Sequence, residues 1–164
     1  MVDCCSAPGL LPFEQAMEKV LSAIKPIDET EFIPLSKALN RVLASNISSP
    51  LNVPPHNNSA MDGYAFKLAS LQDNHTLTMV GRSMAGAPFQ GSCNIGECIR
   101  IMTGAKLPNS CDTVEMQENC QVNDKSITFL EDRTFNDNIR FSGEDIAINQ
   151  QVFSQGKKLS AIDI

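Results

Sequence analysis

The 164-residue sequence contains no tryptophan and only one tyrosine. Proteins that bind single-stranded nucleic acid stack the bases on aromatic side chains, so a surface of that kind is not expected. Basic residues are also scarce, with 13 against 19 acidic ones and a net charge of −6. A chain this acidic repels phosphate backbones, and we therefore expect it to have no nucleic-acid partner.

Long hydrophobic runs are missing as well. No stretch approaches the roughly 18 apolar residues that are needed to cross a bilayer, so we expect no membrane association. The N-terminal stretch, MVDCCSAPGLLPFEQ, carries no basic leader and too short an apolar run for a secretory signal. These two absences predict a cytoplasmic protein. The remaining composition, 42% hydrophobic and 20% charged, is typical of a folded globular chain.

Patterns of familiar metal and nucleotide sites are absent too. The six cysteines form no C-x-x-C pair, and only His56 and His75 stand beside them, so we expect no metal site in this chain. Reduced and mostly buried thiols are the expected state of the cysteines. The stretch GSCNIGEC at 91–98 has two glycines but a glutamate where a phosphate loop needs its lysine.

The strongest periodic pattern predicts a helix over 12–24, which Pro26 ends. A short strand over 31–35 is expected next, followed by a brief helix over 36–39 that Ser36 caps and an extended segment over 41–47. The apolar residues of the first helix recur at the helical spacing and form one stripe. They are Phe13, Ala16, Met17, Val20, Leu21 and Ile24.

After residue 48 the sequence changes to short alternating stretches between turn residues. Three prolines within 48–55 indicate a linker, and Asn123-Asp124 is typical of a hairpin turn. Several short strands at this spacing predict a compact, mainly β module that resembles a barrel. The expected strands are 64–66, 76–80, 97–102, 113–117 and 121–130.

Three stretches place polar side chains at turns, where they can act on a ligand or merely shape the turn. In NNSAMDGYAF, Asp62 either orients a ligand or bonds its own backbone. In RIMTGAKLP, Thr103 offers a hydroxyl and Gly104 gives access to the backbone, or both belong to an ordinary turn. In NIRFSGED, Arg140 binds an anion or pairs with a nearby acid such as Asp145. The residues alone leave each pair of alternatives open.

The order and the exact residues of these stretches, taken together, carry more information than any one stretch alone. NNSAMDGYA, AGAPF, IRIMTGA with the following LPxxxDTVxMQE, and NIRxxGEDI together resemble the MoeA family of molybdopterin molybdenumtransferases, which includes the gephyrin E domain. The resemblance implies an α+β chain. Residues 1–49 plus 142–164 would form a small α/β domain, and residues 50–141 an inserted β-rich domain. The molybdopterin-binding and C-terminal domains of the family would be absent from this chain.

The resemblance also implies an activity. Full-length members insert molybdate into adenylated molybdopterin with Mg²⁺, and they act as homodimers. The implied partners are the second subunit and, as further possibilities, a molybdopterin adenylyltransferase or a molybdenum enzyme. This chain alone is expected to be inactive. Carried over by motif, the catalytic residues are Asp62 and Thr103, and the substrate-binding residues are Ser59, Gly104, Arg140 and Asp145.

Four positions depart from the family pattern. His56 and Asn57 stand where an aromatic residue and an aspartate are usual, Glu115 occupies a strand position that is commonly apolar, and Asn149 replaces a frequent glycine. We expect Glu115 to be exposed or paired, and Asn149 to adopt the left-handed region. The alternative function is a non-catalytic dimerisation or scaffold module of the gephyrin E-domain type. A generic sugar- or nucleotide-binding β domain is disfavoured because it does not explain the motifs that this sequence shares with the MoeA family.

Overall fold

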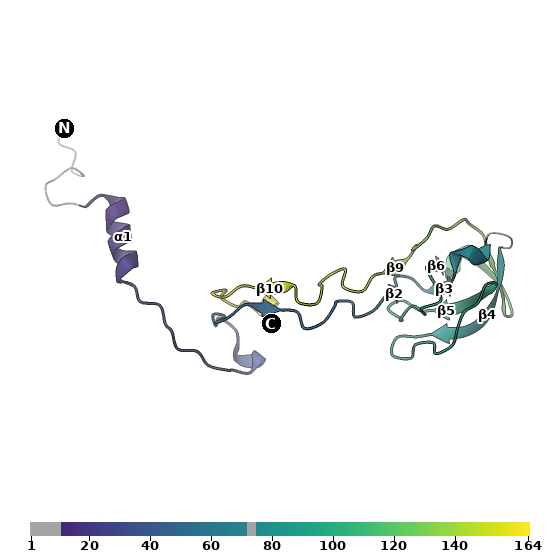
Figure 1. Ribbon diagram of the computed structural model, residues 1–164, viewed down its shortest axis with the longest axis horizontal. Helices are drawn as coiled ribbons and strands as arrows, with labels where there is room; N and C mark the ends of the chain where they lie inside the picture. Colours follow the sequence, from purple (N-terminus) through teal and green to yellow (C-terminus); the bar gives the residue numbers. More distant parts are fainter. Residues whose placement is uncertain (1–10, 72–74) are drawn as a thin grey trace, which may run out of the picture. The chain divides into compact units, whose positions relative to one another are not determined.

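The computed structural model describes residues 11–71 and 75–164 (Figure 1). The chain divides into two compact units, one made of the residues up to Ala44 together with 158–164, the other of 45–157. Residues 45–49 and 142–157, which we expected in the first domain, group here with the β-rich part. The domain boundaries given by the resemblance therefore stay a prediction, and each unit is described by itself.

The first unit contains the predicted helix as α1, Phe13–Ala23. Pro12 precedes its first residue, a position where the missing N–H and the fixed φ of proline cost nothing. The helix ends before Lys25 because the residue that precedes a proline disfavours helical backbone. None of its residues is buried, so the apolar stripe lies open within the described part of this unit.

The predicted strand over 31–35 is wrong. The only regular element near it is a single 3-10 turn, η2, Leu35–Lys37, which begins after Pro34 and receives no side-chain cap from Ser36. An apolar run with a proline and no neighbouring strand lacks the backbone partners that a strand needs. The C-terminal residues instead pair with the following segment, where the N–H of Leu159 donates to the carbonyl of Arg41 at 2.8 Å.

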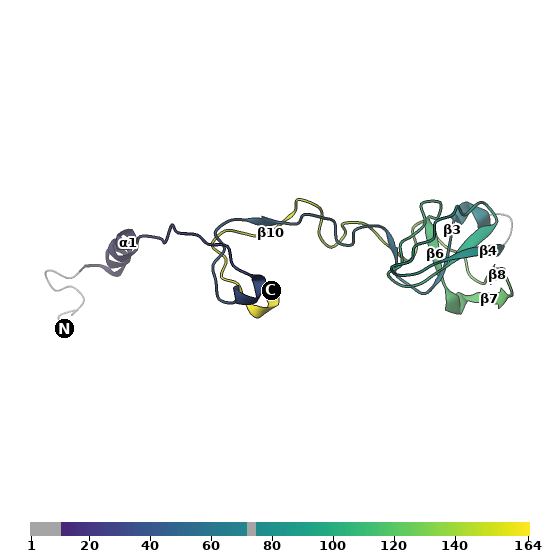
Figure 2. The ribbon, with the colours of Figure 1, turned by 90° about the horizontal axis from the view of Figure 1, so that it is seen from below.

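In the second unit, the segment that leads into the six-stranded sheet and the segment that leads out of it are joined by two short antiparallel strand pairs. Strand β1, Ile47–Ser48, pairs with β10, Gln151–Phe153, and β2, Asn58–Ser59, pairs with β9, Ile139–Arg140. Figures 1 and 2 show the outgoing and returning segments side by side. The extended segment predicted over 41–47 becomes a strand only at its last residue. Asn149, in the return segment, has φ of 66°, which confirms the expected left-handed conformation.

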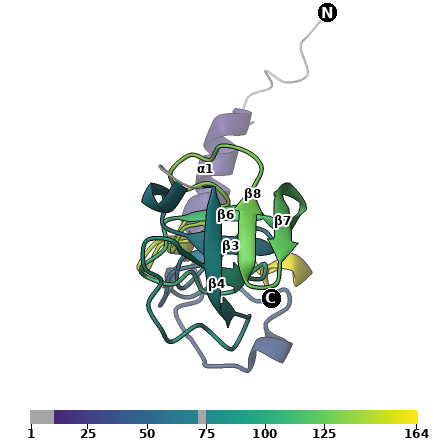
Figure 3. The same ribbon diagram turned by 90° about the vertical axis from the view of Figure 1, so that its right-hand side faces the viewer.

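A six-stranded sheet forms the β-rich part, with strand order β6-β3-β5-β4-β8-β7. All neighbours are antiparallel except β4 and β5, and the sheet curls so that β4, β8 and β7 face the viewer in Figure 3. The hairpin turn consists of Asp124 and Lys125, one residue later than predicted, with φ of 54° at Asp124. The strands are β3 Gly63–Phe66, β4 Thr76–Ser83, β5 Glu97–Ile101, β6 Thr113–Met116, β7 Cys120–Asn123 and β8 Ser126–Phe129.

The curled sheet is buried on both faces at its centre. Along β3, the aromatic residues Tyr64 and Phe66 face one hydrophobic cluster and Ala65 faces the other. Phe66 is fully buried, which contributes about 2–3 kcal/mol relative to an exposed phenylalanine, and its ring lies 4.6 Å from that of Phe129. Side chains of β3 pack into a hydrophobic cluster on each face, and its backbone pairs with β5 and β6. The residues at its start are therefore held in fixed positions.

Candidate functional site

Two of the predicted residues meet at the start of this central strand. Asp62 directly precedes β3, and Thr103 follows the end of β5 by two residues. The two strands are antiparallel, with Gly63 opposite Ile101. Their register therefore brings Asp62 and Thr103 together at the same end of the two strands. The Oδ1 atom of Asp62 accepts hydrogen bonds from the backbone N–H of Thr103 at 2.8 Å and from its Oγ1 at 2.7 Å.

These two bonds favour the ionised form of the Asp62 carboxyl group. They lower the pKa of Asp62 below its ordinary value, first through the Thr103 hydroxyl and then through its backbone N–H, so the carboxyl group is ionised at neutral pH. The hydroxyl hydrogen of Thr103 is committed to the carboxylate, and its oxygen lone pairs remain as acceptors. The pair therefore presents a negative charge and a fixed hydroxyl oxygen at the partly exposed edge of the sheet.

Arg100 supports this pair, although the sequence argument gave it no role. Its guanidinium donates to the carbonyl oxygen of Gly63 at 3.1 Å and to the side chain of Gln117, and it lies 5.1 Å from the centre of the Tyr64 ring. The N–H of Gln117 in turn donates to the carbonyl of Asp62 at 3.0 Å. The arginine within the quoted stretch RIMTGA was the available signal, but its partners come from residues distant in sequence.

Ser59 is buried, and its contacts join the loops of Asp62 and Thr103. It is 1% exposed, and its hydroxyl donates to the carbonyl of Met61 at 2.5 Å while accepting from the Met61 N–H at 3.2 Å. Its backbone carbonyl accepts the N–H of Gly104 at 2.9 Å, and its own N–H donates to Ala105 at 3.0 Å. These contacts lock the loop that carries Asp62 onto the loop that carries Thr103. A contact of Ser59 with substrate stays a prediction.

Gly104 follows with φ of 77°, the left-handed region in which glycine is unstrained. It is exposed and helps to line a cavity of about 340 Å³. Asp62 and Thr103 are not among the lining residues of this cavity. Those residues are Pro55, His56, Asn58, Met84, Ala85, Gly86, Pro88, Gly104 and Lys106.

Arg140 stands on β9, next to the loop of the pair, but its charge is already compensated. Its guanidinium donates to both carboxylate oxygens of Asp145 at 2.7 and 2.8 Å and also to Glu144. The Glu144 bond, followed by those to Asp145, raises the pKa of Arg140, and the same pairing lowers the pKa of Glu144. In this structure Arg140 makes the surface ion pairs that the sequence left as one alternative. Binding of substrate by Arg140 or Asp145 stays a prediction.

The loop that contains the unusual residues His56 and Asn57 is held by a hydrogen bond to a distant turn. The side-chain oxygen of Asn57 accepts the backbone N–H of Ser142 at 2.9 Å, which ties the loop to the turn after β9. The unusual Glu115 is fully buried in β6 and paired with Arg133, and its Oε1 accepts from the N–H of Met116 at 2.6 Å and from Asn119 at 3.1 Å. Of the two expected environments for Glu115, the structure therefore has the paired one.

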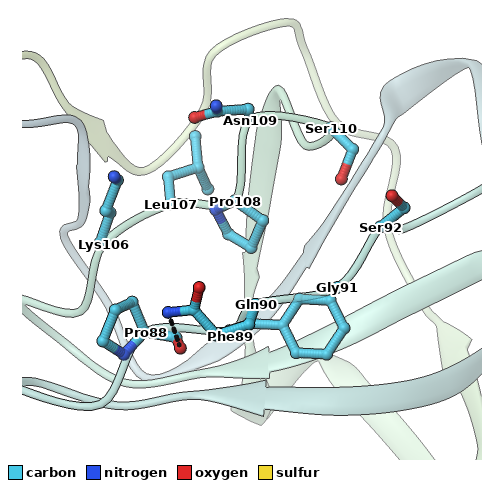
Figure 4. Close-up of a pocket in the computed structure, with 10 residues that line it drawn as sticks. All are labelled: Pro88, Phe89, Gln90, Gly91, Ser92, Lys106, Leu107, Pro108, Asn109 and Ser110. Atoms are coloured by element: carbon cyan, nitrogen blue, oxygen red, sulfur yellow. Dashed lines mark hydrogen bonds between the residues drawn. The ribbon is translucent and has the colours of Figure 1, made fainter.

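A second cavity, of about 370 Å³, lies between the loop that precedes β5 and the loop that precedes β6 (Figure 4). Residues 88–92 form one wall and residues 106–110 the other, and no acidic side chain is among them. Figure 4 shows Lys106 at one end of the cavity and Ser92 and Ser110 at the other. Lys106 and Pro88 line both cavities.

Metal ligands do not gather in the part of the chain that the structure describes. Within 11–71 and 75–164, no group of three or more His, Cys, Asp or Glu side chains is placed to hold an ion. Asp62 supplies a single carboxylate beside the Thr103 hydroxyl, and a Mg²⁺ ion there would take its other ligands from water or substrate phosphates. Among the same residues, no helix has the length and apolar character that crossing a membrane requires.

Comparison with known proteins decides the family. Residues 11–164 match the family model of the MoeA N-terminal region, domains I and II. The chain belongs to the MoeA family. It is 43% identical over 156 residues to the molybdopterin molybdenumtransferase of Haemophilus influenzae and 30% identical over 159 residues to that of Bacillus subtilis. The matches cover 94% and 92% of this chain but only 39% and 37% of the relatives, so the chain spans about two fifths of their length.

Solved structures agree with this membership. Two crystal structures of the molybdopterin biosynthesis MoeA protein from Pyrococcus horikoshii superimpose with TM-scores of 0.82 and 0.79, at 28% and 30% sequence identity. Each match covers 94% of this chain and 40% or 42% of the solved chain. The mostly β architecture of the described residues, with one α-helix and a curled sheet, is therefore consistent with that of the MoeA N-terminal region.

Proposed function

We propose that this chain is the N-terminal part of a molybdopterin molybdenumtransferase, the enzyme that inserts molybdate into adenylated molybdopterin during molybdenum cofactor biosynthesis. In this proposal the chain supplies one wall of the active-site cleft. The names of the relatives support the reaction class. The observation that carries the proposal is the double hydrogen bond between Asp62 and Thr103, at the ends of two central strands.

The pair is suited to a substrate that donates hydrogen bonds. An ionised carboxylate with a fixed hydroxyl oxygen can hold the N–H groups of a pterin or a water molecule at a defined position. Its geometry needs no rearrangement, because the backbone bonds between Ser59, Gly104 and Ala105 fix both loops in advance. We therefore assign Asp62 and Thr103 to positioning and proton handling at the reacting group.

Anionic groups must be held by other parts of the enzyme. The guanidinium of Arg140 is paired with two carboxylates, and that of Arg100 is engaged by Gly63 and Gln117. Buried phosphate and molybdate oxygens need compensating charge, which the wall around Asp62 does not offer. We infer that the isolated chain is inactive and that the domains present in its longer relatives supply the basic groups.

Mg²⁺ belongs to the reaction of the whole enzyme in this proposal. It would neutralise phosphate and molybdate oxygens when bound. Among the described residues, no three or more ligands gather for such an ion, and the site around Asp62 offers one carboxylate and one hydroxyl. No step in the role of this chain therefore depends on the metal.

The whole protein is proposed to be a cytoplasmic homodimer that exchanges substrate with a molybdopterin adenylyltransferase or a molybdenum enzyme. A non-catalytic dimerisation or scaffold module is the second candidate, and one observation favours it. The apolar stripe of α1 is open, with Phe13 74% and Leu21 60% exposed, as expected of a surface that packs against another chain or domain. This candidate predicts self-association of the chain without any effect of Asp62 or Thr103.

A chimera separates the two candidates. Residues 11–164 would replace the matching region of the Haemophilus influenzae enzyme, and molybdate insertion into adenylated molybdopterin would be measured. The proposal predicts turnover by the chimera and none by the isolated chain. A chimera that folds and dimerises yet inserts no molybdate would support the scaffold role, and turnover by the isolated chain would contradict the division of labour proposed here.

A further inference from the structure

Two buried cysteines directly follow, in the sequence, the two stretches that line the cavity of Figure 4. Cys93 is 4% exposed and Cys111 is 7% exposed, and both belong to the same hydrophobic cluster. The backbone N–H of Cys93 donates to the hydroxyl oxygen of Ser110 at 3.0 Å, and the two thiols hydrogen-bond to each other. Cys93 and Cys111 are 18 positions apart, so the fold, and not the local sequence, brings them together.

The two thiols have different environments. The Cys111 thiol donates to the sulfur of Cys93, which lowers the pKa of Cys93, while the same bond and burial raise the pKa of Cys111. The Cys93 thiol itself donates to the carbonyl oxygen of Glu97 at 3.2 Å. A thiol with a lowered pKa next to one that stays protonated is the arrangement in which the first attacks an oxidant and the second resolves the product.

Each cysteine directly follows one wall of the cavity. Residues 88–92 end at Cys93, and residues 106–110 end at Cys111. The backbone N–H of Cys93 donates to the hydroxyl of Ser110, the residue just before Cys111, so the ends of the two walls meet there. A covalent bond between the two sulfurs would therefore join the two walls at that end.

We propose that Cys93 and Cys111 form a reversible oxidation site, at which a hydroperoxide generates a disulfide that fastens the two walls of the cavity to each other. The site is independent of the Asp62–Thr103 pair and of the reaction proposed above. A disulfide would bring the two sulfurs, which are already in hydrogen-bonding contact, to about 2.0 Å.

The chemistry balances with the peroxide as the only co-reactant. The Cys93 thiolate attacks one oxygen of hydrogen peroxide, the O–O bond breaks, and hydroxide leaves, giving a sulfenic acid. The sulfur of Cys111 then attacks the sulfur of Cys93, the S–O bond breaks, and the departing hydroxide takes up the Cys111 proton as water. Two thiols lose two electrons and two protons in total, and one peroxide becomes two waters. A dithiol reductant reverses the step by thiol–disulfide exchange.

Two other cysteines of the same sheet serve as internal controls. Burial raises the pKa of Cys98 to about 12 and that of Cys120 to about 11, so both remain thiols at neutral pH. Cys98 is fully buried on β5, and the Cys120 thiol donates to the carbonyl of Met116 at 3.4 Å. Because the thiolate is the reactive form, we expect their oxidation to be about tenfold or more slower than that of Cys93.

The test uses the 164-residue chain with Cys4→Ser and Cys5→Ser, treated with hydrogen peroxide and digested without reductant. The expected product is a peptide pair joined through Cys93 and Cys111, lighter by two hydrogens and separated again by dithiothreitol. In Cys111→Ser, Cys93 should stop at the sulfenic acid and be labelled by dimedone, whereas Cys98→Ser should leave the crosslink unchanged. Slower amide hydrogen exchange over 88–92 and 106–110 after oxidation is the expected sign of fastened walls.

Several results would overturn the proposal. One is a chain that stays folded in peroxide, by circular dichroism, but gains no Cys93–Cys111 crosslink. Another is a crosslink that forms only in urea, because the native contact would then be irrelevant. A crosslink dominated by Cys98 and Cys120 would also contradict it. A crosslink that leaves amide hydrogen exchange over 88–92 and 106–110 unchanged would contradict the claim that the disulfide holds the two walls together.

Discussion

A single oxygen atom of Asp62, Oδ1, accepts both the backbone N–H and the hydroxyl of Thr103, a residue 41 positions further along the chain. The antiparallel register of β3 and β5 creates this contact, and the loop around Ser59 fixes it from behind. The pair lies at the edge of the sheet, outside both hydrophobic clusters. Substitutions here are therefore expected to affect chemistry more than folding.

Asp62→Ala in the chimera with the Haemophilus influenzae enzyme should reduce molybdate insertion about a hundredfold, because the Thr103 hydroxyl loses the acceptor that orients it. Asp62→Asn keeps an oxygen for both hydrogen bonds and removes only the charge, so its loss should be smaller. Initial rates and thermal melting are measured together. A melting temperature that collapses in Asp62→Ala would indicate that the aspartate serves only the turn.

Acid should weaken the fold through three carboxylates. The pKa values of Asp62 and Asp137 are lowered from 3.8, chiefly by the hydroxyls of Thr103 and Thr134, and that of Glu144 is lowered from 4.5 by Arg140. A lowered folded-state pKa stabilises the fold above the unfolded value, and this contribution is lost as the pH falls through the lowered value. Melting temperature should therefore be level near neutral pH and fall below about pH 4.5.

Asp137→Asn is the matched variant for this pH dependence. It should be less stable than the parent chain at pH 7 and should approach the parent at the lowest pH, where the carboxyl group of the parent is protonated. The free energy of unfolding is measured by urea titration at each pH. A difference between the two chains that is the same at all pH values would contradict a contribution from the ionised carboxylate.

Gly63 is required by the spacing of β3 and β6. A Cβ atom at this position would lie 1.7 Å from the carbonyl oxygen of Glu115 and 2.7 Å from its carbonyl carbon, and both are backbone atoms that cannot rotate away. Gly63→Ala should therefore destabilise the chain by about 3 kcal/mol. Gly96→Ala is the control, since Gly96 has φ of 84° and open space around it, so only backbone strain of about 1–2 kcal/mol is expected. Equal losses in the two variants would refute the steric argument.

The buried pair of Glu115 and Arg133 predicts non-additive losses. Arg133→Met leaves the fully buried carboxylate without its cation and should cost about 3 kcal/mol. Combining it with Glu115→Gln should recover part of this loss, because the amide oxygen still accepts from Met116 and Asn119 while the charge is gone. The measurement is a double-mutant cycle by urea unfolding. Additive losses would mean that the two side chains are not coupled.

Elements with a strong local signal were predictable from the sequence. The stripe from Phe13 to Ile24 specified α1, and alternation between turn residues located every strand of the six-stranded sheet to within a few residues. The segment 31–35 was assigned wrongly because its apolar residues satisfied the local pattern, whereas a strand also needs a partner. Sequence patterning does not reveal whether such a partner exists.

The site was predictable only in part for a similar reason. Asp62 and Thr103 were named from their motifs, but their shared hydrogen bonds depend on the register between two strands. Arg100 was quoted and left without a role, since its partners Gly63 and Gln117 are far from it in sequence. Glu115 is buried together with its charge partner, Arg133, which is also distant in sequence. Long-range partners decide the environment of each of these side chains.

The most direct measurement compares Thr103→Val with Thr103→Ser in the chimera, as rates of molybdate insertion into adenylated molybdopterin. Valine keeps the backbone N–H that bonds Asp62 but removes the hydroxyl, and serine keeps both. We predict a loss of about a hundredfold for valine, near-parental activity for serine, and similar melting temperatures for the two. Equal and near-parental activity of both variants would contradict the assignment of the Asp62–Thr103 pair to the reaction.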